Sequence, residues 1–241
     1  LGRLQEAAAQ AEAALERLPH DSSLHSILAA VAGQQGDLAR ALQSYRQAVQ
    51  QDPSNAGLRL ELARALRRAG QSDEAMEEIE RILSISRDLP EVHRERALLF
   101  RAQGDLEAAE EAYADALQTL QGAPDLWAEY GGLLQQLGRS ELALKAFQRA
   151  VELRPDDAQG LQQLASAHQA AGSLTEARAA LDRAVEIDPE DAHAQHALAL
   201  VLEGLGDREA ALTTMERAAE LDPTLAEARR DLARLYSSRG L

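Results

Sequence analysis

Arginine side chains recur at helical spacing in two neighbouring segments, and the chemistry that they offer is carboxylate binding. They are Arg64, Arg67, Arg68, Arg94 and Arg101. A guanidinium is always charged and presents paired N–H groups that match the two oxygens of a carboxylate. Because Leu62 and Leu66 are expected in the core, the arginines of the first segment must point away from it.

Two of these arginines have an acidic residue three positions earlier, Glu61 before Arg64 and Glu91 before Arg94. Such pairs on one helix stabilise it by only a few tenths of a kcal/mol, roughly 0.2 to 0.5. The other three have no such local partner, so the sequence predicts that they are available to a ligand: Arg67, Arg68 and Arg101.

Side-chain amides follow in the next two segments of this kind. They are Gln135, Gln136, Gln159, Gln162, Gln163 and Gln169, with Ser166 among them. An amide both donates and accepts hydrogen bonds, so it can bind the backbone of an extended peptide. Arginines and amides together would suit an acidic, partly extended segment. A solvated arginine-rich face without a ligand is the alternative interpretation.

Histidines supply the one metal-like cluster, which consists of Asp191, His193 and His196. Residues three apart on a helix face the same way, as a zinc site would need. Three such residues at a helix start are a weak signal, and a solvated first turn is the favoured interpretation, so we predict no metal and no cofactor. The other histidines of apolar rows are expected to be partly buried packing residues: His25, His93 and His168.

Catalytic motifs are absent from the sequence. The chain has no cysteine, which excludes disulfides, thiolate metal sites and thiol catalysis. It also lacks a phosphate-binding glycine loop and the G-x-S-x-G and H-E-x-x-H motifs. Paired carboxylates such as Glu110 and Glu111 fall in helices or turns where solvation is the default. The sequence therefore predicts a protein that is not an enzyme.

A repeat of 34 residues must position all of these side chains. Glycine recurs at this interval at Gly2, Gly36, Gly70, Gly104, Gly138, Gly172, Gly206 and Gly240. A row of alanines keeps the same interval from Ala7 to Ala211. Apolar residues between the glycines have helical spacing and β-branched residues are scarce, so each repeat is expected to be two helices, with the glycine closing the first. The predicted fold class is all-α.

The period divides the chain into six complete repeats and two incomplete ends. The complete repeats span 22–55, 56–89, 90–123, 124–157, 158–191 and 192–225. Residues 3–18 are expected to form a lone second helix and residues 226–239 a lone first helix, within a single array over 1–241. The last helix would expose a face that could mediate self-association, formed by Leu232, Leu235 and Tyr236.

The repeat resembles the tetratricopeptide repeat (TPR) over the full length of the chain. The residues that carry the resemblance most fully are Trp127, Tyr130, Gly131, Leu134, Gly138, Ala143, Phe147, Ala150 and Pro155. The resemblance implies a right-handed superhelical solenoid of antiparallel helix pairs. It also implies that first helices line a concave groove, where the arginines and amides would lie, and that second helices form the convex back.

Two junctions depart from the family pattern. Arg87 and Gln121 occupy positions at which the other second helices end in proline, and Pro90 and Pro124 follow three residues later. Because proline is tolerated in the first turn of a helix, we expect these two prolines to begin the next helices. The preceding helices are then expected to run longer or to end loosely.

The ligand-binding residues of the best-known TPR proteins are missing. With one lysine and one asparagine, Asn55, the chain cannot build the clamp with which chaperone-binding members hold a C-terminal carboxylate. The asparagine ladder of the O-linked N-acetylglucosamine transferase array is missing for the same reason. Arg59 and Arg96 occupy positions that the family usually fills with apolar residues, so the second and third repeats are the least regular.

Composition narrows the partners further. The 241 residues include 40 acidic and 25 basic side chains, which disfavours nucleic acid as a partner, and the seven aromatic residues fall at core positions of the repeat. No run of apolar residues is long enough to predict membrane insertion, and the start at Leu1 lacks the features of a signal peptide. We expect a piece of a longer parent, whose compartment the sequence leaves open.

Charge distribution completes the functional prediction. The net charge of −15 divides into +3 over the expected first helices and −18 over the remaining residues. In the geometry that the resemblance implies, the groove is therefore neutral to basic. The sequence predicts a non-enzymatic scaffold that binds a protein or peptide in this groove. Two alternatives stay open: a recruiting module of a larger enzyme, of glycosyltransferase, sulfotransferase or hydroxylase type, and a self-assembly module.

Overall fold

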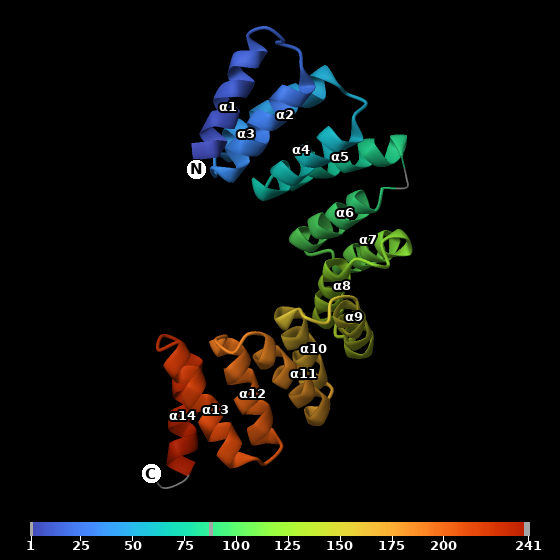
Figure 1. The fold of residues 1–241 in the computed structure, drawn as a ribbon. Coiled ribbons are helices and arrows are strands. Elements are labelled where there is room, and N and C mark those ends of the chain that lie inside the picture. Colours follow the sequence, from blue (N-terminus) through green and yellow to red (C-terminus); the bar gives the residue numbers. More distant parts are fainter. Residues whose placement is uncertain (1, 87–88, 239–241) are drawn as a thin grey trace. The chain divides into compact units, whose positions relative to one another are not determined.

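The computed structural model describes residues 2–86 and 89–238, and all regular secondary structure in these ranges is helical (Figure 1). The chain divides into two compact units, Leu1–Thr119 and Leu120–Leu241. The N-terminal unit contains α1 (Gly2–Leu15), α2 (Ser22–Gln34), α3 (Leu38–Gln51), α4 (Ala56–Arg68), α5 (Ser72–Ile85), α6 (Pro90–Gln103) and α7 (Leu106–Thr119). The C-terminal unit contains α8 (Pro124–Gln136), α9 (Ser140–Leu153), α10 (Ala158–Ala170), α11 (Leu174–Ile187), α12 (Ala192–Gly204), α13 (Arg208–Leu221) and α14 (Ala226–Ser238). The predicted all-α class is confirmed.

The N-terminal unit is a stack of helix pairs. α2 packs on α3, α4 on α5 and α6 on α7, and each second helix also contacts the first helix that follows it within the unit. Leu66, Ile79 and Ile82 are at most 2% exposed and form the centre of its core. α4 also contacts α6, so that neighbouring first helices lie side by side.

The C-terminal unit repeats this arrangement with α8 on α9, α10 on α11 and α12 on α13, and α14 packs on α13. Ala143 is fully buried, as expected for a small residue where two helices cross closely. Gly131 also lets two paired helices approach closely, because a Cβ atom there would lie only 2.9 Å from the Phe147 ring. The predicted small rows therefore set the distance between paired helices.

The repeated glycines end the first helices as predicted. Gly36, Gly70, Gly104, Gly138, Gly172 and Gly206 all have a positive φ, between 71° and 85°. At Gly70 the left-handed residue lets the next amide, from Gln71, donate back to the carbonyl of Leu66 at 2.9 Å. Other residues adopt this backbone conformation only with strain, which explains the glycine at every turn of this kind.

At the two irregular junctions, Pro90 and Pro124 begin the next helices, as predicted. Four first helices are capped by a side chain that accepts backbone N–H groups, from Asp21, Asn55, Asp157 and Asp191. At the same position Leu89 and Ala123 cannot cap, and Pro90 and Pro124 follow in the first turn, where a missing N–H costs nothing. The preceding helices, α5 and α7, keep the 14 residues of the other complete second helices and do not run longer. Arg87 lies outside the described residues.

Side-chain donors join five of the first helices to the turn that precedes each of them. Four side chains hydrogen-bond the carbonyl six residues earlier: His25 with Pro19, Arg59 with Pro53, Trp127 with Gln121 and Gln195 with Pro189. The same row holds Leu161, which has no donor, and there Arg183 from α11 donates to the carbonyl of Pro155 at 2.8 Å. His25 was predicted only as a packing residue, and these hydrogen bonds add a polar contact at the start of the five helices.

The two arginines at usually apolar positions form ion pairs inside helix pairs. Arg59 lies 2.5 Å from Glu78, and the two side chains are 13% and 9% exposed. Arg96 lies 3.1 Å from Asp115, which has the same spacing of 19 residues. In the row of Glu78 the other complete repeats have small residues: Ser44, Ala112, Ala146, Ala180 and Thr214. An ion pair thus replaces apolar packing between α4 and α5.

The predicted exposed face of the last helix is only partly present. Leu235 is 5% exposed and packs in a cluster with Met215, so the prediction for this residue is wrong. Leu232 and Tyr236 are half-buried, and the Tyr236 hydroxyl donates to Glu216 at 2.6 Å. α13 therefore already covers much of the apolar stripe of α14.

Candidate functional site

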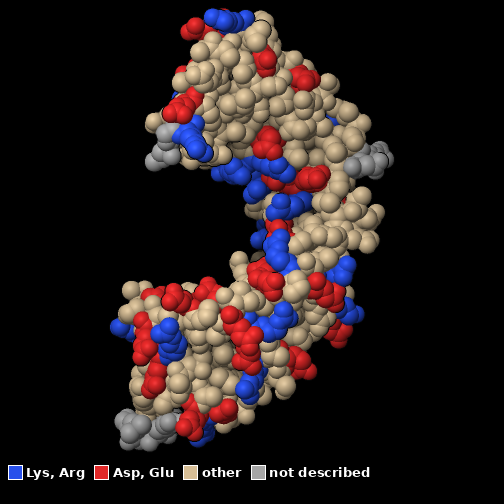
Figure 2. Space-filling model, in the orientation of Figure 1, with Lys and Arg blue, Asp and Glu red and all other residues tan. Residues whose placement is uncertain are grey.

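The predicted arginines lie on α4 and α6, two first helices that contact each other. Figure 2 shows Lys and Arg side chains gathered, with some Asp and Glu, over the part of the N-terminal unit where these helices lie. Arg68 is exposed, and the other four are half-buried: Arg64, Arg67, Arg94 and Arg101. The structure therefore brings the five arginines onto neighbouring helices of one unit.

Two of them are already bound to a carboxylate that the sequence analysis missed. Arg67 donates from Nε to Oε1 of Glu95, and the Nε of Arg64 lies 3.8 Å from Oε2 of the same side chain. Glu95 belongs to α6 and its side chain is 5% exposed. Arg64 also pairs with Glu61 at 2.5 Å, as predicted. Arg67 has no acidic partner on its own helix, but Glu95 of the neighbouring first helix already binds it.

Arg68 and Arg101 differ from the other three arginines of this set. Neither forms an ion pair with any residue in the ranges 2–86 and 89–238, whereas Arg94 has interactions of its own with the protein. The surface thus contains two arginines that already bind a carboxylate and two that are unpaired. An unpaired guanidinium on a protein surface is the side chain best suited to a planar anionic group.

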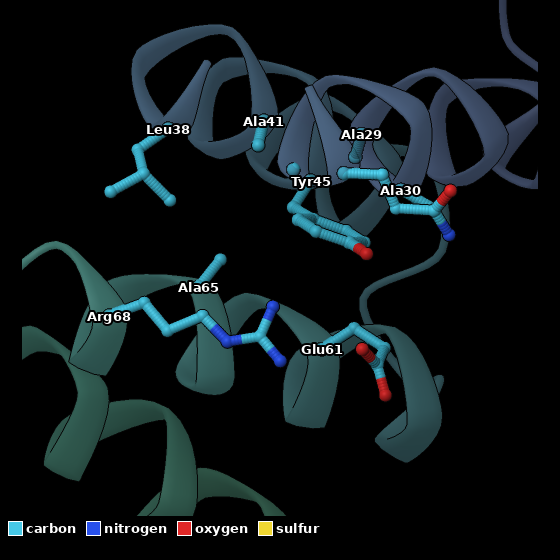
Figure 3. A pocket seen from close by; sticks show the side chains of 10 residues that line it. Ala29, Ala30, Leu38, Ala41, Tyr45, Glu61, Ala65 and Arg68 are labelled. Carbon is cyan, nitrogen blue, oxygen red and sulfur yellow. The ribbon is translucent and has the colours of Figure 1, made fainter. Parts of the chain in front are cut away.

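A pocket of about 350 Å³ opens beside this surface, between α2, α3 and α4 (Figure 3). Its lining consists mainly of Ala29, Ala30, Gly33, Ala41, Tyr45, Glu61, Ala65 and Arg68. In Figure 3 the Tyr45 ring reaches from α3 toward α4, and the Arg68 guanidinium and the Glu61 carboxylate lie across the gap from it. Burial, with help from the Glu61 carboxylate, raises the pKa of the Tyr45 hydroxyl against the opposing effect of Arg68 and Arg64. The hydroxyl therefore stays protonated and can donate.

The predicted amides lie on α8 and α10 of the C-terminal unit, which contact each other. Four of these polar residues are exposed, namely Gln135, Gln136, Gln159 and Ser166, and Gln163 and Gln169 are half-buried. Gln162 is engaged, because its amide donates to Asp191 at 2.7 Å. The exposed amides can bind a peptide backbone, whereas Gln162 links α10 to the start of α12.

The histidine cluster does not converge. Asp191 accepts the backbone N–H groups of His193 and Ala194 as a helix cap, and His196 instead lies 2.9 Å from Asp231 on α14. In the described part of the chain no three His, Cys, Asp or Glu side chains are placed to hold a metal ion. His25, His93 and His168 are half-buried, as expected for packing residues.

The aromatic side chains divide into two groups. Tyr45, Tyr113 and Phe147 are at most 8% exposed and belong to the core, as predicted. The remaining four are half-buried: Phe100, Trp127, Tyr130 and Tyr236.

None of the helices within 2–86 and 89–238 is long and apolar enough to cross a membrane.

Comparisons with known families cover nearly the whole sequence. Models described as tetratricopeptide repeats match residues 34–99, residues 1–56 with 131–192, and residues 192–225, and a model of YpiA-like, C-terminal tetratricopeptide repeats matches residues 90–157. Together these matches extend over residues 1–225. No curated protein matches the sequence.

Solved structures share the fold at low sequence identity. pilF of Pseudomonas aeruginosa has a TM-score of 0.73 at 18% identity, over 88% of this chain and 97% of its own. A tetratricopeptide repeat protein from Parabacteroides merdae has a TM-score of 0.69 at 19% identity, over 90% and 86%. YrrB, described as a TPR protein with an unusual peptide-binding site, has a TM-score of 0.68 at 22% identity, over 79% and 98%. The helical repeats, their turn glycines and these matches together identify the chain as a member of the tetratricopeptide repeat family.

Proposed function

We propose that the chain is a peptide-binding scaffold whose N-terminal unit binds an acidic, partly extended protein segment on α4 and α6. TPR proteins are generally non-catalytic interaction scaffolds, and the solved structure of YrrB has a peptide-binding site. The observation that carries the proposal is the pair of unpaired arginines, Arg68 and Arg101, beside two arginines that already hold Glu95. The same surface can offer the unpaired guanidinium groups to a carboxylate from outside.

Amides on α8 and α10 support the same class of ligand. Gln135, Gln136 and Gln159 are exposed and can donate to and accept from the backbone of an extended segment. They carry no charge, so the C-terminal unit would bind a peptide backbone without selecting its sequence. The arginines of the N-terminal unit would select for acidic residues in the segment that this unit binds.

The experiment measures binding of fluorescein-labelled synthetic peptides by fluorescence polarisation. One peptide of about twelve residues carries alternating Glu residues, and its partner carries Gln at the same positions. We expect the acidic peptide to bind more tightly and to lose affinity as salt increases, since exposed charges are screened. Arg68→Glu with Arg101→Glu should weaken binding of the acidic peptide at least about tenfold.

Arg149→Glu with Arg178→Glu is the matched control, because it makes the same change in net charge at two exposed arginines of second helices. The control should bind the acidic peptide nearly as the unaltered protein does. Equal loss in the control would mean that only the net charge matters. Equal affinity for the two peptides, or no binding of either, would overturn the proposal.

A further inference from the structure

The pocket between α2, α3 and α4 exists because three side chains are shorter than their equivalents in most other repeats. Gly33 occupies the position of Arg67, Arg101, Gln135, Gln169 and Glu203. Ala65 occupies the position of Val31, Leu99, Leu133, Ala167 and Val201. Ala30 occupies the position of Arg64, Leu98, Gly132, Ser166 and Leu200. Together these truncations remove side-chain volume at one junction between repeats.

The fold does not require glycine at position 33. Gly33 is not among the glycines with a positive φ, and it lies inside α2. A Cβ atom there would meet only the Cβ of Ala41, at 4.0 Å, which is ordinary contact. Glycine within a helix is less stable than alanine, so Gly33 lowers the stability of α2. What the missing side chain provides is open space.

The Tyr45 hydroxyl faces this space. Tyr45 is 8% exposed and lines the pocket, and its hydroxyl is open to water and has no hydrogen-bond partner among the described residues. The unpaired Arg68 guanidinium lies across the gap, whereas the Glu61 carboxylate beside it is paired with Arg64 (Figure 3). The pocket therefore has walls formed largely by alanine and a rim with the Tyr45 hydroxyl, the unpaired Arg68 guanidinium and the Glu61 carboxylate, whose charge is offset by Arg64.

We infer that this pocket accepts an apolar side chain of leucine or phenylalanine size that is adjacent to an acidic residue in the bound segment. The apolar side chain would fill the space between Ala30, Gly33 and Ala65, and Arg68 would bind the neighbouring carboxylate. Tyr45 would donate to an oxygen of the same segment. This inference rests on the proposed peptide-binding function and defines the sequence that the N-terminal unit selects.

Three labelled peptides test it by fluorescence polarisation: an acidic peptide with a central Leu, the same peptide with a central Ala, and the Leu peptide with its Glu residues replaced by Gln. We expect the first to bind about tenfold more tightly than either of the others, because the apolar contact and the charge contact are both needed. Equal affinity for the Leu and Ala peptides would overturn the inference while the proposed function still stood. Failure of every peptide to bind would overturn both.

Variants at the pocket sharpen the result. Gly33→Leu fills the space with a residue that a helix tolerates well. In this variant the Leu and Ala peptides should bind with about the same affinity. Gly33→Ala, which leaves most of the space open, is its control and should keep the preference. Tyr45→Phe removes only the hydroxyl and should weaken binding a few-fold, roughly threefold, without loss of helicity. A retained Leu preference in a folded Gly33→Leu protein would contradict the inference.

Discussion

Arg67 binds Glu95 across two neighbouring first helices, so the basic surface of the N-terminal unit already contains a carboxylate of its own. Glu95 is buried between the helices, and the Nε of Arg64 lies 3.8 Å from its second oxygen. An internal carboxylate of this kind orders the guanidinium groups, and it also competes with any acidic ligand for them. For the proposed function we therefore expect the charge of Glu95 to weaken the binding of an acidic ligand.

Replacing Glu95 should therefore strengthen binding. In Glu95→Gln the side chain keeps its size but loses its charge, which frees the guanidinium of Arg67 for a ligand, while Arg64 stays paired with Glu61. We expect the acidic peptide to bind roughly threefold to tenfold more tightly, as measured by fluorescence polarisation. Glu107→Gln, an exposed acid on second helix α7, makes the same change in net charge and is the control. Unchanged or weaker binding in Glu95→Gln would argue against competition.

The buried pair of Arg59 and Glu78 should behave as a coupled unit in stability. Glu78→Ala leaves Arg59 buried without its carboxylate, and we expect a loss of about 2 to 3 kcal/mol in the free energy of unfolding. Adding Arg59→Trp reproduces the pair found at the equivalent positions of the fourth repeat, Trp127 with Ala146. The double variant should regain most of the loss in urea denaturation. A double variant as unstable as Glu78→Ala would show that the pair is not interchangeable with apolar packing.

The substitute donor at Pro155 offers a test of the polar row. Arg183→Met removes the hydrogen bond to that carbonyl, and we expect a cost of about 0.5 to 1 kcal/mol because water can partly replace the arginine. Arg178→Met is the control, since Arg178 on the same helix pairs only with the exposed Asp182. Thermal unfolding followed by circular dichroism measures both variants. Equal melting temperatures would mean that the Pro155 contact contributes nothing.

The last helix should be held more weakly in acid. Arg234 donates two hydrogen bonds to Glu203, at 2.7 and 2.8 Å, and these bonds lower the pKa of Glu203. Because the pKa is lower in the folded protein, this stabilisation is present above the unfolded-state pKa and is lost as the pH falls through the folded-state value. Arg234 is about half exposed, so its contribution is at most about 1 kcal/mol.

Hydrogen exchange of α14 amides measures this effect directly. Arg234→Gln should exchange faster than the unaltered protein near pH ~7, and the difference should shrink as the pH falls through the lowered pKa of Glu203. Arg230→Gln, an exposed arginine on the same helix, is the control and should change little. A difference that persists in acid would require a cause other than the charge of Glu203.

Local signals explain why much of the fold could be predicted from the sequence. Gly70 and its equivalents end helices through their own backbone freedom, and Pro90 and Pro124 begin helices because their fixed φ suits the first turn. Each of these effects depends on residues within one turn. The 34-residue period then repeats the same helix ends in each helix pair along the chain.

Contacts between repeats explain what could not be predicted. Glu95 was missed because only neighbours three or four residues away were considered, whereas its partner Arg67 is 28 residues earlier. Arg46 and Glu74 form an ion pair at the same spacing of 28 residues. Oppositely charged residues at this spacing are therefore the sequence signal that indicates a pair such as Arg67 with Glu95. The pocket was missed because it is made by absent side-chain volume, which becomes visible only when the rows of Gly33 and Ala65 are compared across repeats.

The most direct test of the account is to map the bound acidic peptide on the isotopically labelled 241-residue chain by nuclear magnetic resonance. The account predicts that the largest shifts on titration fall on the side-chain Nε–H groups of Arg68 and Arg101 and on backbone amides of α2, α4 and α6. Shifts confined to second helices, with the two arginine signals unmoved while the peptide binds, would contradict it.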